Sequence, residues 1–456
     1  MLKNFLLTGF CLITACSLSL FSADPAVRSV NVTVYNSDLG VIRENRSIET
    51  KQGISEIRIA DVAERIDPTS VHIRLDGSVL EQNYQYDLVS LNKILEKYID
   101  KQIQLTGKEG KFFEGTLLSV NNNQIVLRQK DGGLLMLPKL DEYQLLVGSL
   151  PEGLITKPTL VWTIDTKKTG RQDAELSYMT SGMNWHAEYV AVLNNDDTKM
   201  DLNSWVSIVN SSGATYKDAT LKLVAGDVNF VSDAGAMDEM NKSMRYTLAE
   251  SAPSQQFREK EFFEYHIYNL QRQTTIANNE TKQISLFEAS DVKVTKKFLL
   301  KSNNYASGKM KVAVVVEFEN KEKNKLGIPM PKGKVRMYKS DGESVEFIGE
   351  DMIDHTPKDE KLKLKVGDAF DIVAEQKEEE QKKIYDRVAE HRYLITLKNR
   401  KSEDVEIEVE RQLGYNWEIL ESSHKYDKKD AQTLLFKVNV KKGEEEEVRF
   451  RVRYAY

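Results

Sequence analysis

Cysteine is almost absent from this 456-residue chain, which has two, Cys11 and Cys16, both near its start. No later thiol can form a disulfide, act as a thiolate nucleophile or ligate zinc through sulfur. A disulfide-dense fold is therefore excluded. At about 150 residues per domain the length suggests about three domains, with cores large enough to be stable without cross-links.

An excess of positive charge is also lacking. Lys and Arg number 64 against 70 Asp and Glu, which gives a formal charge of -6. Phosphate-backbone binding relies on a basic surplus, so we expect no nucleic-acid partner. The hydrophobic fraction of 40% and the charged fraction of 29% are typical of a globular protein and not of one with many membrane spans.

Local catalytic signatures are missing as well. The six histidines (His72, His186, His266, His355, His391 and His424) are too far apart in the sequence for a local metal motif, and H-E-x-x-H, G-x-S-x-G, Walker and dinucleotide fingerprints are absent. These absences favour a protein without enzymatic activity and without a cofactor. A site assembled from distant segments stays open.

The first 22 residues have the order of a secretory signal. Lys3 provides a short positive region, residues 5–21 are apolar, and the chain turns polar from Ala23. Leu-Ile-Thr-Ala-Cys16 resembles a bacterial lipobox, in which the cysteine carries lipid. The apolar residues after Cys16 leave ordinary cleavage near Ser22 or Ala23 open as an alternative, and an uncleaved anchor is a third. We expect export to the periplasm, the outer membrane or the cell surface, with membrane contact through a lipid anchor if Cys16 is modified.

Alternation of apolar and polar residues dominates the rest of the chain. It is clear at 30–34, 310–318, 405–409, 434–440 and 448–454. In the last of these segments every odd-numbered residue is an arginine, which predicts a strand with one buried face and one wet, cationic face. Short strands between turn residues, without a βαβ pattern, predict a mainly β fold of several antiparallel β-sandwiches.

One segment departs from this pattern. Asp87 is placed to cap a helix over 88–100, in which Leu88, Leu91, Leu95 and Tyr98 share one face. Short strands separated by Gly and Asn turns follow it. A helix leading into such strands resembles a small SH3-like or Sm-like barrel, and we interpret it as an inserted packing or spacer module.

Two changes in composition complete the domain plan. Residues 227–261 have few branched aliphatic side chains, which predicts a flexible connector, and the charged run 375–383 predicts a long solvated hairpin or a short exposed helix. The expected order is a signal peptide (1–22), an N-terminal β region (24–87), the helix-plus-barrel insert (88–140), a central β-sandwich region (141–226), the connector (227–261), the second part of the central region (262–383) and a C-terminal Ig-like sandwich (384–456).

The densest set of chemical groups is Glu350, Asp351, Asp354 and His355, followed by Asp359 and Glu360. Such groups can ligate Ca²⁺ or form the carboxylate pair of a glycoside hydrolase. The set lacks the alternating ligand spacing of a calcium loop. We therefore favour a turn whose acids face water, with no metal ligand and no catalytic residue.

A second cluster contains Trp185, His186, Glu188 and Tyr189, which could line a carbohydrate or peptide groove. In a strand, however, Trp185 and Tyr189 share one face while His186 and Glu188 share the other. We therefore interpret Trp185 as a core residue. Trp205 and Trp417 are expected to anchor cores in the same way.

Several phrases together carry a family resemblance. They lie at 81–88 (Glu-Gln-Asn-Tyr-Gln-Tyr-Asp-Leu), 178–189 (Tyr-Met-Thr-Ser-Gly-Met-Asn-Trp-His-Ala-Glu-Tyr), 205–216, 223–228, 262–266, 281–283 and 349–360. In this order they resemble the bacterial family known as domain of unknown function 4139, with a more distant similarity to mucoidy-inhibitor-like proteins. The resemblance implies an exported, β-rich protein and brings no catalytic residue with it.

Two functions remain. The first is a non-catalytic binding or structural module of the cell envelope, with an envelope protein or a glycan as partner. The second is an envelope hydrolase that acts on cell-wall glycan or protein through the loop near His355. The two differ in whether Glu350, Asp351, Asp354 and His355 converge in one cleft.

The N-terminal alternatives can be separated by mass spectrometry of the mature protein. Lipidation predicts a diacylated chain that begins at Cys16, whereas ordinary cleavage predicts an unmodified chain that begins at Ala23 or Asp24. The unmodified chain would end the lipoprotein hypothesis.

Overall fold

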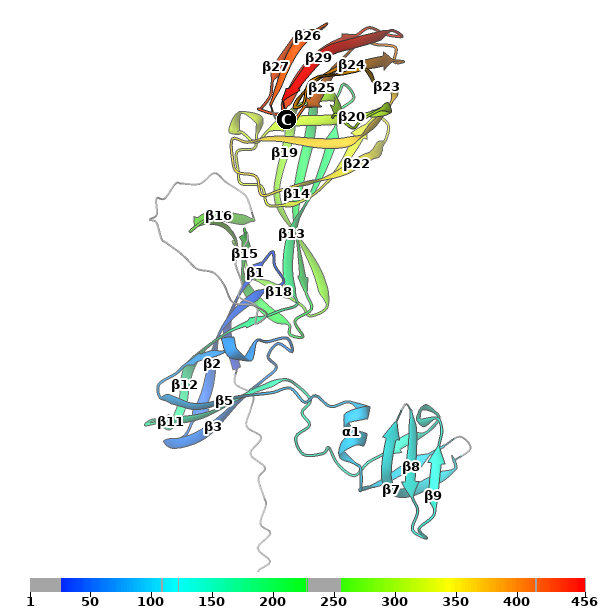
Figure 1. Cartoon of the computed structure of the whole chain (residues 1–456). Coiled ribbons are helices and arrows are strands. Elements are labelled where there is room, and N and C mark those ends of the chain that lie inside the picture. Colours follow the sequence, from blue (N-terminus) through cyan, green and yellow to red (C-terminus); the bar gives the residue numbers. More distant parts are fainter. Residues whose placement is uncertain are drawn as a thin grey trace, which may run out of the picture. The chain divides into compact units, whose positions relative to one another are not determined.

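The computed structural model describes residues 26–107, 110–121, 123–226, 228, 256–414 and 416–455. The signal segment, Cys16 and most of the expected connector lie outside these residues. The described chain is mainly β, as expected (Figure 1). It divides into two compact units, Met1–Val30 with Arg43–Tyr178, and Asn31–Ile42 with Met179–Tyr456. None of the helices in the described part of the chain is long and apolar enough to cross a membrane.

The first unit contains a three-stranded antiparallel sheet. Its strands, in order, are β3 (Gly53–Ala60), β11 (Thr159–Thr166) and β5 (Ser78–Gln85). The central strand β11 is almost fully buried, and the indole of Trp162 donates to Gln82 Oε1 at 2.9 Å. The strands β2 (Gly40–Thr50), β12 (Gly170–Thr180) and β4 (His72–Arg74) lie side by side in another sheet.

The insert is a helix packed on a five-stranded antiparallel sheet. Its elements are α1 (Leu91–Lys97), β6 (Gln102–Thr106), β7 (Phe112–Asn121), β8 (Gln124–Arg128), β9 (Leu134–Leu137) and β10 (Gln144–Leu146), with strand order β10-β6-β7-β8-β9 (Figure 1). Leu95 and Tyr98 pack into a core with residues from β6, β7, β8 and β9. The sheet extends past the expected end at residue 140. It is not a closed barrel, because no ladder joins β9 to β10 among the described residues.

The helix is also shorter than the sequence predicts. Ser90 caps it, accepting from the backbone N–H of Lys93 at 3.3 Å, in place of Asp87. The reason is tertiary, since the backbone of residues 87–89 bonds to that of Ile155 on the return connection. This pairing keeps Leu88 and Val89 extended and delays the start of the helix.

The second unit is built on a 13-stranded sheet. Its main path is β22 (Val345–Ile353), β21 (Gly333–Ser340), β13 (Met183–Leu193), β14 (Lys199–Asn210), β19 (Glu280–Ser302), β20 (Gly308–Glu319), β23 (Lys361–Tyr385), β24 (Val388–Asn399), β29 (Glu445–Ala455) and β26 (Trp417–Ser422). Strands β13 and β21 are parallel, as are β19 and β25 (Val405–Gln412). The sheet is therefore mixed, where the sequence suggested antiparallel strands.

Further strands accompany this sheet. In this unit, residues of β1 (Ala26–Tyr35) pair in parallel with β15 (Tyr216–Ala225), which also pairs with β17 (Tyr265–Leu270) and β18 (Thr274–Ile276). Strand β16 (Phe257–Phe262) pairs with β17 and lies at the end of the expected connector. The indole of Trp185 donates to the Val224 carbonyl at 3.0 Å and packs edge-on against Tyr268. This confirms Trp185 as a core residue.

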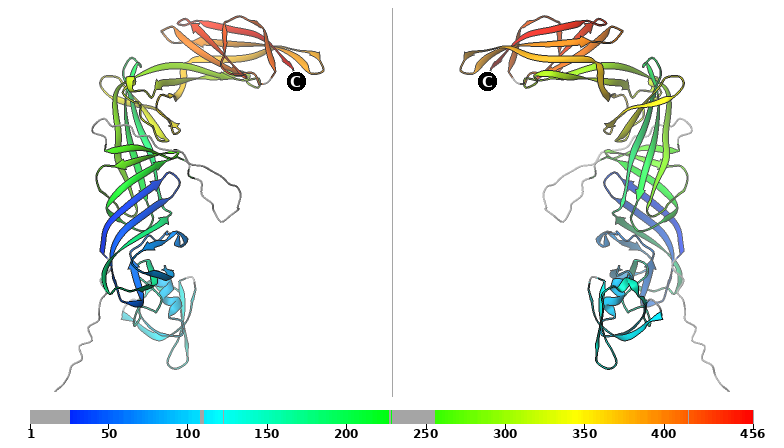
Figure 2. Two further views of the ribbon diagram at one scale, coloured as in Figure 1. Left: turned by 90° about the vertical axis from the view of Figure 1, so that its left-hand side faces the viewer. Right: turned by 90° about the vertical axis from the view of Figure 1, so that its right-hand side faces the viewer.

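The C-terminal strands form a sandwich (Figure 2). Strands β24, β29 and β26 share a core with β25, β28 (Thr433–Val440) and β27 (Tyr426–Lys428). The same core contains Leu300, Val312 and Ile372, and residue 384 lies inside β23. The core therefore begins well before the boundary expected at 384. The charged run 375–383 belongs to the β23–β24 hairpin. Of the two structures predicted for this run, the structure therefore has the long hairpin and not the short helix.

The arginine face of β29 is not a free cationic surface. Arg449 lies against Glu379 and Glu447, and Arg451 and Arg453 share Glu390. Further carboxylates come from Glu380, Glu418 and Glu421 on β23 and β26. The neighbouring strands carry acids at matching register, so the expected cationic face is replaced by a charge-paired one.

Phe436 and Phe370 provide a matched test of this core. Phe436 is fully buried between Tyr426 and Phe450, whereas Phe370 on β23 is 95% exposed. We expect Phe436→Ala to lower the free energy of unfolding of this unit by about 3–5 kcal/mol through loss of buried area and the cavity left behind. Phe370→Ala should change it by about 0.5 kcal/mol or less. Denaturant titration measures both, and equal losses would contradict this core assignment.

Candidate functional site

The acidic residues singled out in the sequence do not meet in one place. Glu350 and Asp351 are neighbours on β22 and point to opposite faces. The Glu350 carboxylate lies 3.2 Å from Lys334 Nζ, whereas Asp351 accepts from the backbone N–H of Lys365 at 2.7 Å. The two carboxylates therefore have separate partners on separate elements.

Asp354 and His355 follow the strand. The Asp354 side chain is 93% exposed and lies 3.7 Å from Lys332 Nζ, and His355 Nδ1 accepts from the backbone N–H of Lys332 at 3.1 Å. Within the described residues no group of three His, Cys, Asp or Glu side chains is placed to hold a metal ion. The four predicted residues thus lie along the β22 connection without converging on a shared cleft.

The tertiary structure instead joins Glu350 to the second cluster, through Arg336. Parallel pairing of β13 with β21 places Val190 beside Arg336, and antiparallel pairing of β21 with β22 places Arg336 beside Glu350. The Arg336 guanidinium donates to the Glu188 carboxylate, and its Nε lies 3.8 Å from Glu350. Two segments far apart in the sequence therefore share one cation on one face of the sheet.

His186 and Lys334 complete this arrangement. His186 Nε2 lies 3.1 Å from Glu188 Oε1, and Lys334 pairs with Glu350. We call His186, Glu188, Lys334, Arg336 and Glu350 the charged strip. All five side chains remain partly exposed, from 20% for Glu188 to 48% for Glu350. The strip is therefore accessible to a ligand from solvent.

The electrostatics of the strip keep its central carboxyl ionised. Partial burial pushes the pKa of Glu188 upward, but hydrogen bonds from Arg336 and His186 outweigh it and lower that pKa below its usual value. The hydrogen bond to Glu188 in turn raises the pKa of Arg336. A general acid at neutral pH needs a raised carboxyl pKa, so Glu188 is suited to binding and not to proton donation.

Trp205 lies on this same face, which corrects the expectation that it anchors a core. It is 41% exposed on β14, directly opposite Glu188 on β13. Asn203 on the same strand is also partly exposed, whereas Ser204 and Val206 are buried. The polar alternation of 201–207 was the sequence signal that could have placed it outward. Trp417, the other expected anchor, is only partly buried at the edge of the sandwich core.

Apolar side chains flank the other side of the strip. Met352 pairs with Lys334 and is 55% exposed, and Phe347 packs edge-on against Tyr338 at 5.6 Å between ring centres. Four paired residues, one each on β14, β13, β21 and β22, form a row across the sheet. In order they are Trp205, Glu188, Lys334 and Met352. At about 4.8 Å between strands this row is about 14 Å long. We call this face, with the charged strip between its apolar ends, the Trp205 platform.

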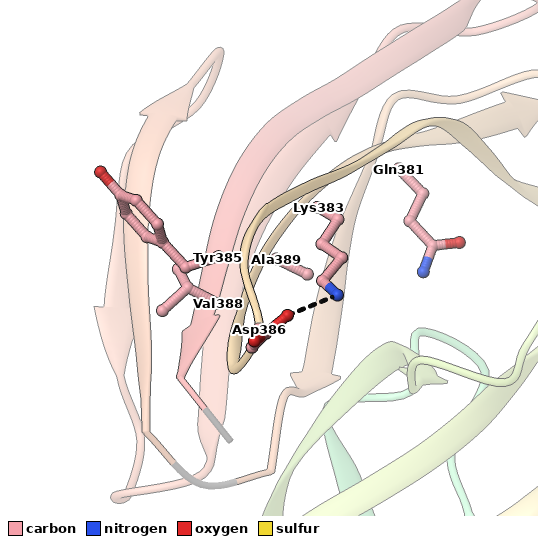
Figure 3. Close-up of a pocket in the computed structure, with 6 residues that line it drawn as sticks. All are labelled: Gln381, Lys383, Tyr385, Asp386, Val388 and Ala389. Carbon is pink, nitrogen blue, oxygen red and sulfur yellow. Dashed lines mark hydrogen bonds and ion pairs between the residues drawn. The ribbon is translucent and has the colours of Figure 1, made fainter.

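Shallow hollows lie elsewhere in the described residues. One is at the tip of the β23–β24 hairpin, where Lys383 donates to Asp386 at 2.9 Å and Tyr385 points away from them (Figure 3). Another lies beside Lys321 and Asp359. Neither includes a residue of the platform, so the candidate site is an open sheet surface.

The pairing of Glu188 predicts a pH-dependent stability. Because its pKa is lowered by folding, the pairing stabilises the fold above the ordinary value of 4.5 and is lost as the pH falls through the lowered one. We expect Glu188→Gln to lower the free energy of unfolding by about 1 kcal/mol or less at neutral pH. The cost should disappear in acid. Denaturant titrations across this range measure the difference, with exposed Glu343→Gln in the β21–β22 turn as the control. A cost that does not change with pH would contradict the role of the pair.

Comparison with known proteins places the chain in a family. No curated protein matches it. A family model described as domain of unknown function (DUF4139) matches residues 174–456, which is more than half of the chain and includes the whole Trp205 platform. The phrase at 81–88 lies outside the matched region. The chain belongs to the DUF4139 family.

Proposed function

We propose that this protein is an exported, non-catalytic binding protein of the bacterial cell envelope. The observation that carries the proposal is the Trp205 platform, in which an exposed indole lies beside polar groups already held by one another. Side chains held in place before binding lose little freedom when a ligand arrives, which favours recognition. The platform is open and its central carboxyl stays ionised, both of which suit binding better than bond cleavage.

The hydrolase alternative receives little support from the geometry. It requires Glu350, Asp351, Asp354 and His355 to surround one substrate bond, with two carboxyl groups facing each other across it. Asp351 instead accepts from the backbone of Lys365, and Asp354 extends into solvent. The binding function needs no such convergence.

Export rests on the N-terminal sequence. Residues 1–22 have the order of a secretory signal, with lipidation of Cys16 as one route to a membrane anchor. Cleavage near residue 22 leaves no cysteine and cleavage before Cys16 leaves one, so in either case no disulfide can form within the mature chain. We place the protein in the periplasm, the outer membrane or the cell surface, with an envelope glycan or protein as its partner.

A sedimentation assay with isolated bacterial envelopes tests the proposal. The tagged chain without residues 1–22 should sediment with the envelopes, and Trp205→Ala should remain largely in the supernatant. Phe370→Ala, which removes an exposed aromatic side chain far along the sequence on β23, should behave like the unaltered chain.

The same reaction mixtures report on catalysis. We expect no soluble sugar or peptide fragments to be released from the envelopes. If such fragments are released and Glu350→Gln abolishes their release, the protein is a hydrolase and the proposed binding function is wrong. Failure of the unaltered chain to sediment would overturn the proposal.

A further inference from the structure

We infer that the Trp205 platform binds an uncharged polysaccharide, with a sugar ring stacked on Trp205 and hydroxyl groups bonded to the charged strip. This inference rests on the proposed function and names the ligand class of that site. Its evidence is the exposure of Trp205, the charge balance of the strip, the length of the platform and the pairing of its strands.

The exposure of Trp205 sets it apart from the two core tryptophans. Trp162 and Trp185 are buried, and their indole N–H groups donate to protein oxygens. Trp205 instead presents 41% of its surface from the middle of β14, a strand paired on both sides. A large aromatic ring on such a rigid support offers an apolar surface at low entropic cost. The C–H faces of a pyranose ring are complementary to this surface.

The charge balance of the strip selects against an ionic ligand. Glu188 and Glu350 are matched by Lys334 and Arg336, which leaves no surplus charge when His186 is neutral. Donors and acceptors remain available, because a guanidinium has five N–H donors and a carboxylate about four acceptor positions. Neighbouring hydroxyl groups of a sugar supply both a donor and an acceptor, and so can join the network without breaking it.

The length of the platform favours a chain over a single sugar. Its row of about 14 Å has Trp205 at one end and Met352 at the other, with Tyr338 and Phe347 close to the second end. Two separated apolar ends with polar groups between them suit an extended oligosaccharide. Asn203, which is partly exposed beside Trp205, adds an uncharged hydrogen-bonding group.

Strand pairing excludes the usual mode of peptide capture at the centre of the platform. A peptide that adds to a sheet needs an unpaired edge strand. Strand β13 pairs with β14 and β21, and β14 pairs with β13 and β19. The backbone groups beneath the row are therefore already bonded, and a ligand there must bind through side chains.

The test is a fluorescence titration with uncharged hexasaccharides of β-1,4-linked N-acetylglucosamine, β-1,4-linked glucose and α-1,4-linked glucose. We expect at least one of them to change the tryptophan emission and to bind with an affinity that added salt does not alter, because the ligand is neutral. Trp205→Ala should weaken this binding by about tenfold or more, which corresponds to about 1.4 kcal/mol. Trp205→Phe should retain part of the affinity, and Trp417→Phe should retain all of it.

Two further results would overturn the inference. One is binding of polygalacturonate, an anionic polymer, that salt abolishes while no neutral hexasaccharide binds. The other is sedimentation with envelopes that depends on Trp205 while no hexasaccharide binds, which leaves the binding function intact and removes its ligand class. Failure of the unaltered chain to sediment with envelopes counts against the proposed function instead. Circular dichroism of each variant separates lost binding from lost folding.

Discussion

The register of β13 is the constraint on which the second unit depends. This strand lies between antiparallel β14 and parallel β21, with Trp185 and Tyr189 inside and His186 and Glu188 outside. A shift by one residue would exchange the two faces. Gly333 helps to hold the register, because a Cβ there would lie 2.0 Å from the Ala187 carbonyl oxygen. The core and the Trp205 platform therefore lie on opposite faces of the same paired strands.

Cross-strand ion pairs occur in two settings in this protein, on β29 and in the charged strip. On β29, Arg451 and Arg453 are held by acids from adjacent strands, and Glu390 serves both. In the charged strip, Arg336 likewise lies between two acids, but an exposed tryptophan lies on the same face. Pairs of this kind add little stability individually. Their consequence is a set of sheet faces that are rich in paired charges.

Arg411 shows how the sandwich is joined without disulfides. Its guanidinium is fully buried, donates to Ser302 at 3.1 Å and Asn304 at 2.8 Å, and stacks over the Tyr393 ring at 4.4 Å. Burial lowers the pKa of Arg411 and outweighs the opposing effects of Tyr454, Tyr393 and Glu378. The contacts connect β25 to β19, which is distant in sequence, and to the preceding strand β24, and so fix the two layers against each other.

The sequence by itself determined the properties that depend on neighbouring residues. Alternation identified the strands at 310–318 and 448–454, the inward face of Trp185 and the outward face of Glu188, and the charged run at 375–383 was compatible with the hairpin found there. The family was also recognisable from its phrases. The same alternation rule applied to 201–207 would have placed Trp205 outward, but its size suggested a core residue.

Only the tertiary structure decided which strands became neighbours. The helix start at Ser90 depends on pairing with Ile155, and the meeting of Glu188, Arg336 and Glu350 depends on parallel pairing of β13 with β21. The physical reason is that side-chain alternation follows from the geometry of one backbone. Strand neighbours and register, in contrast, are selected by hydrogen bonding and packing between segments that are remote along the chain.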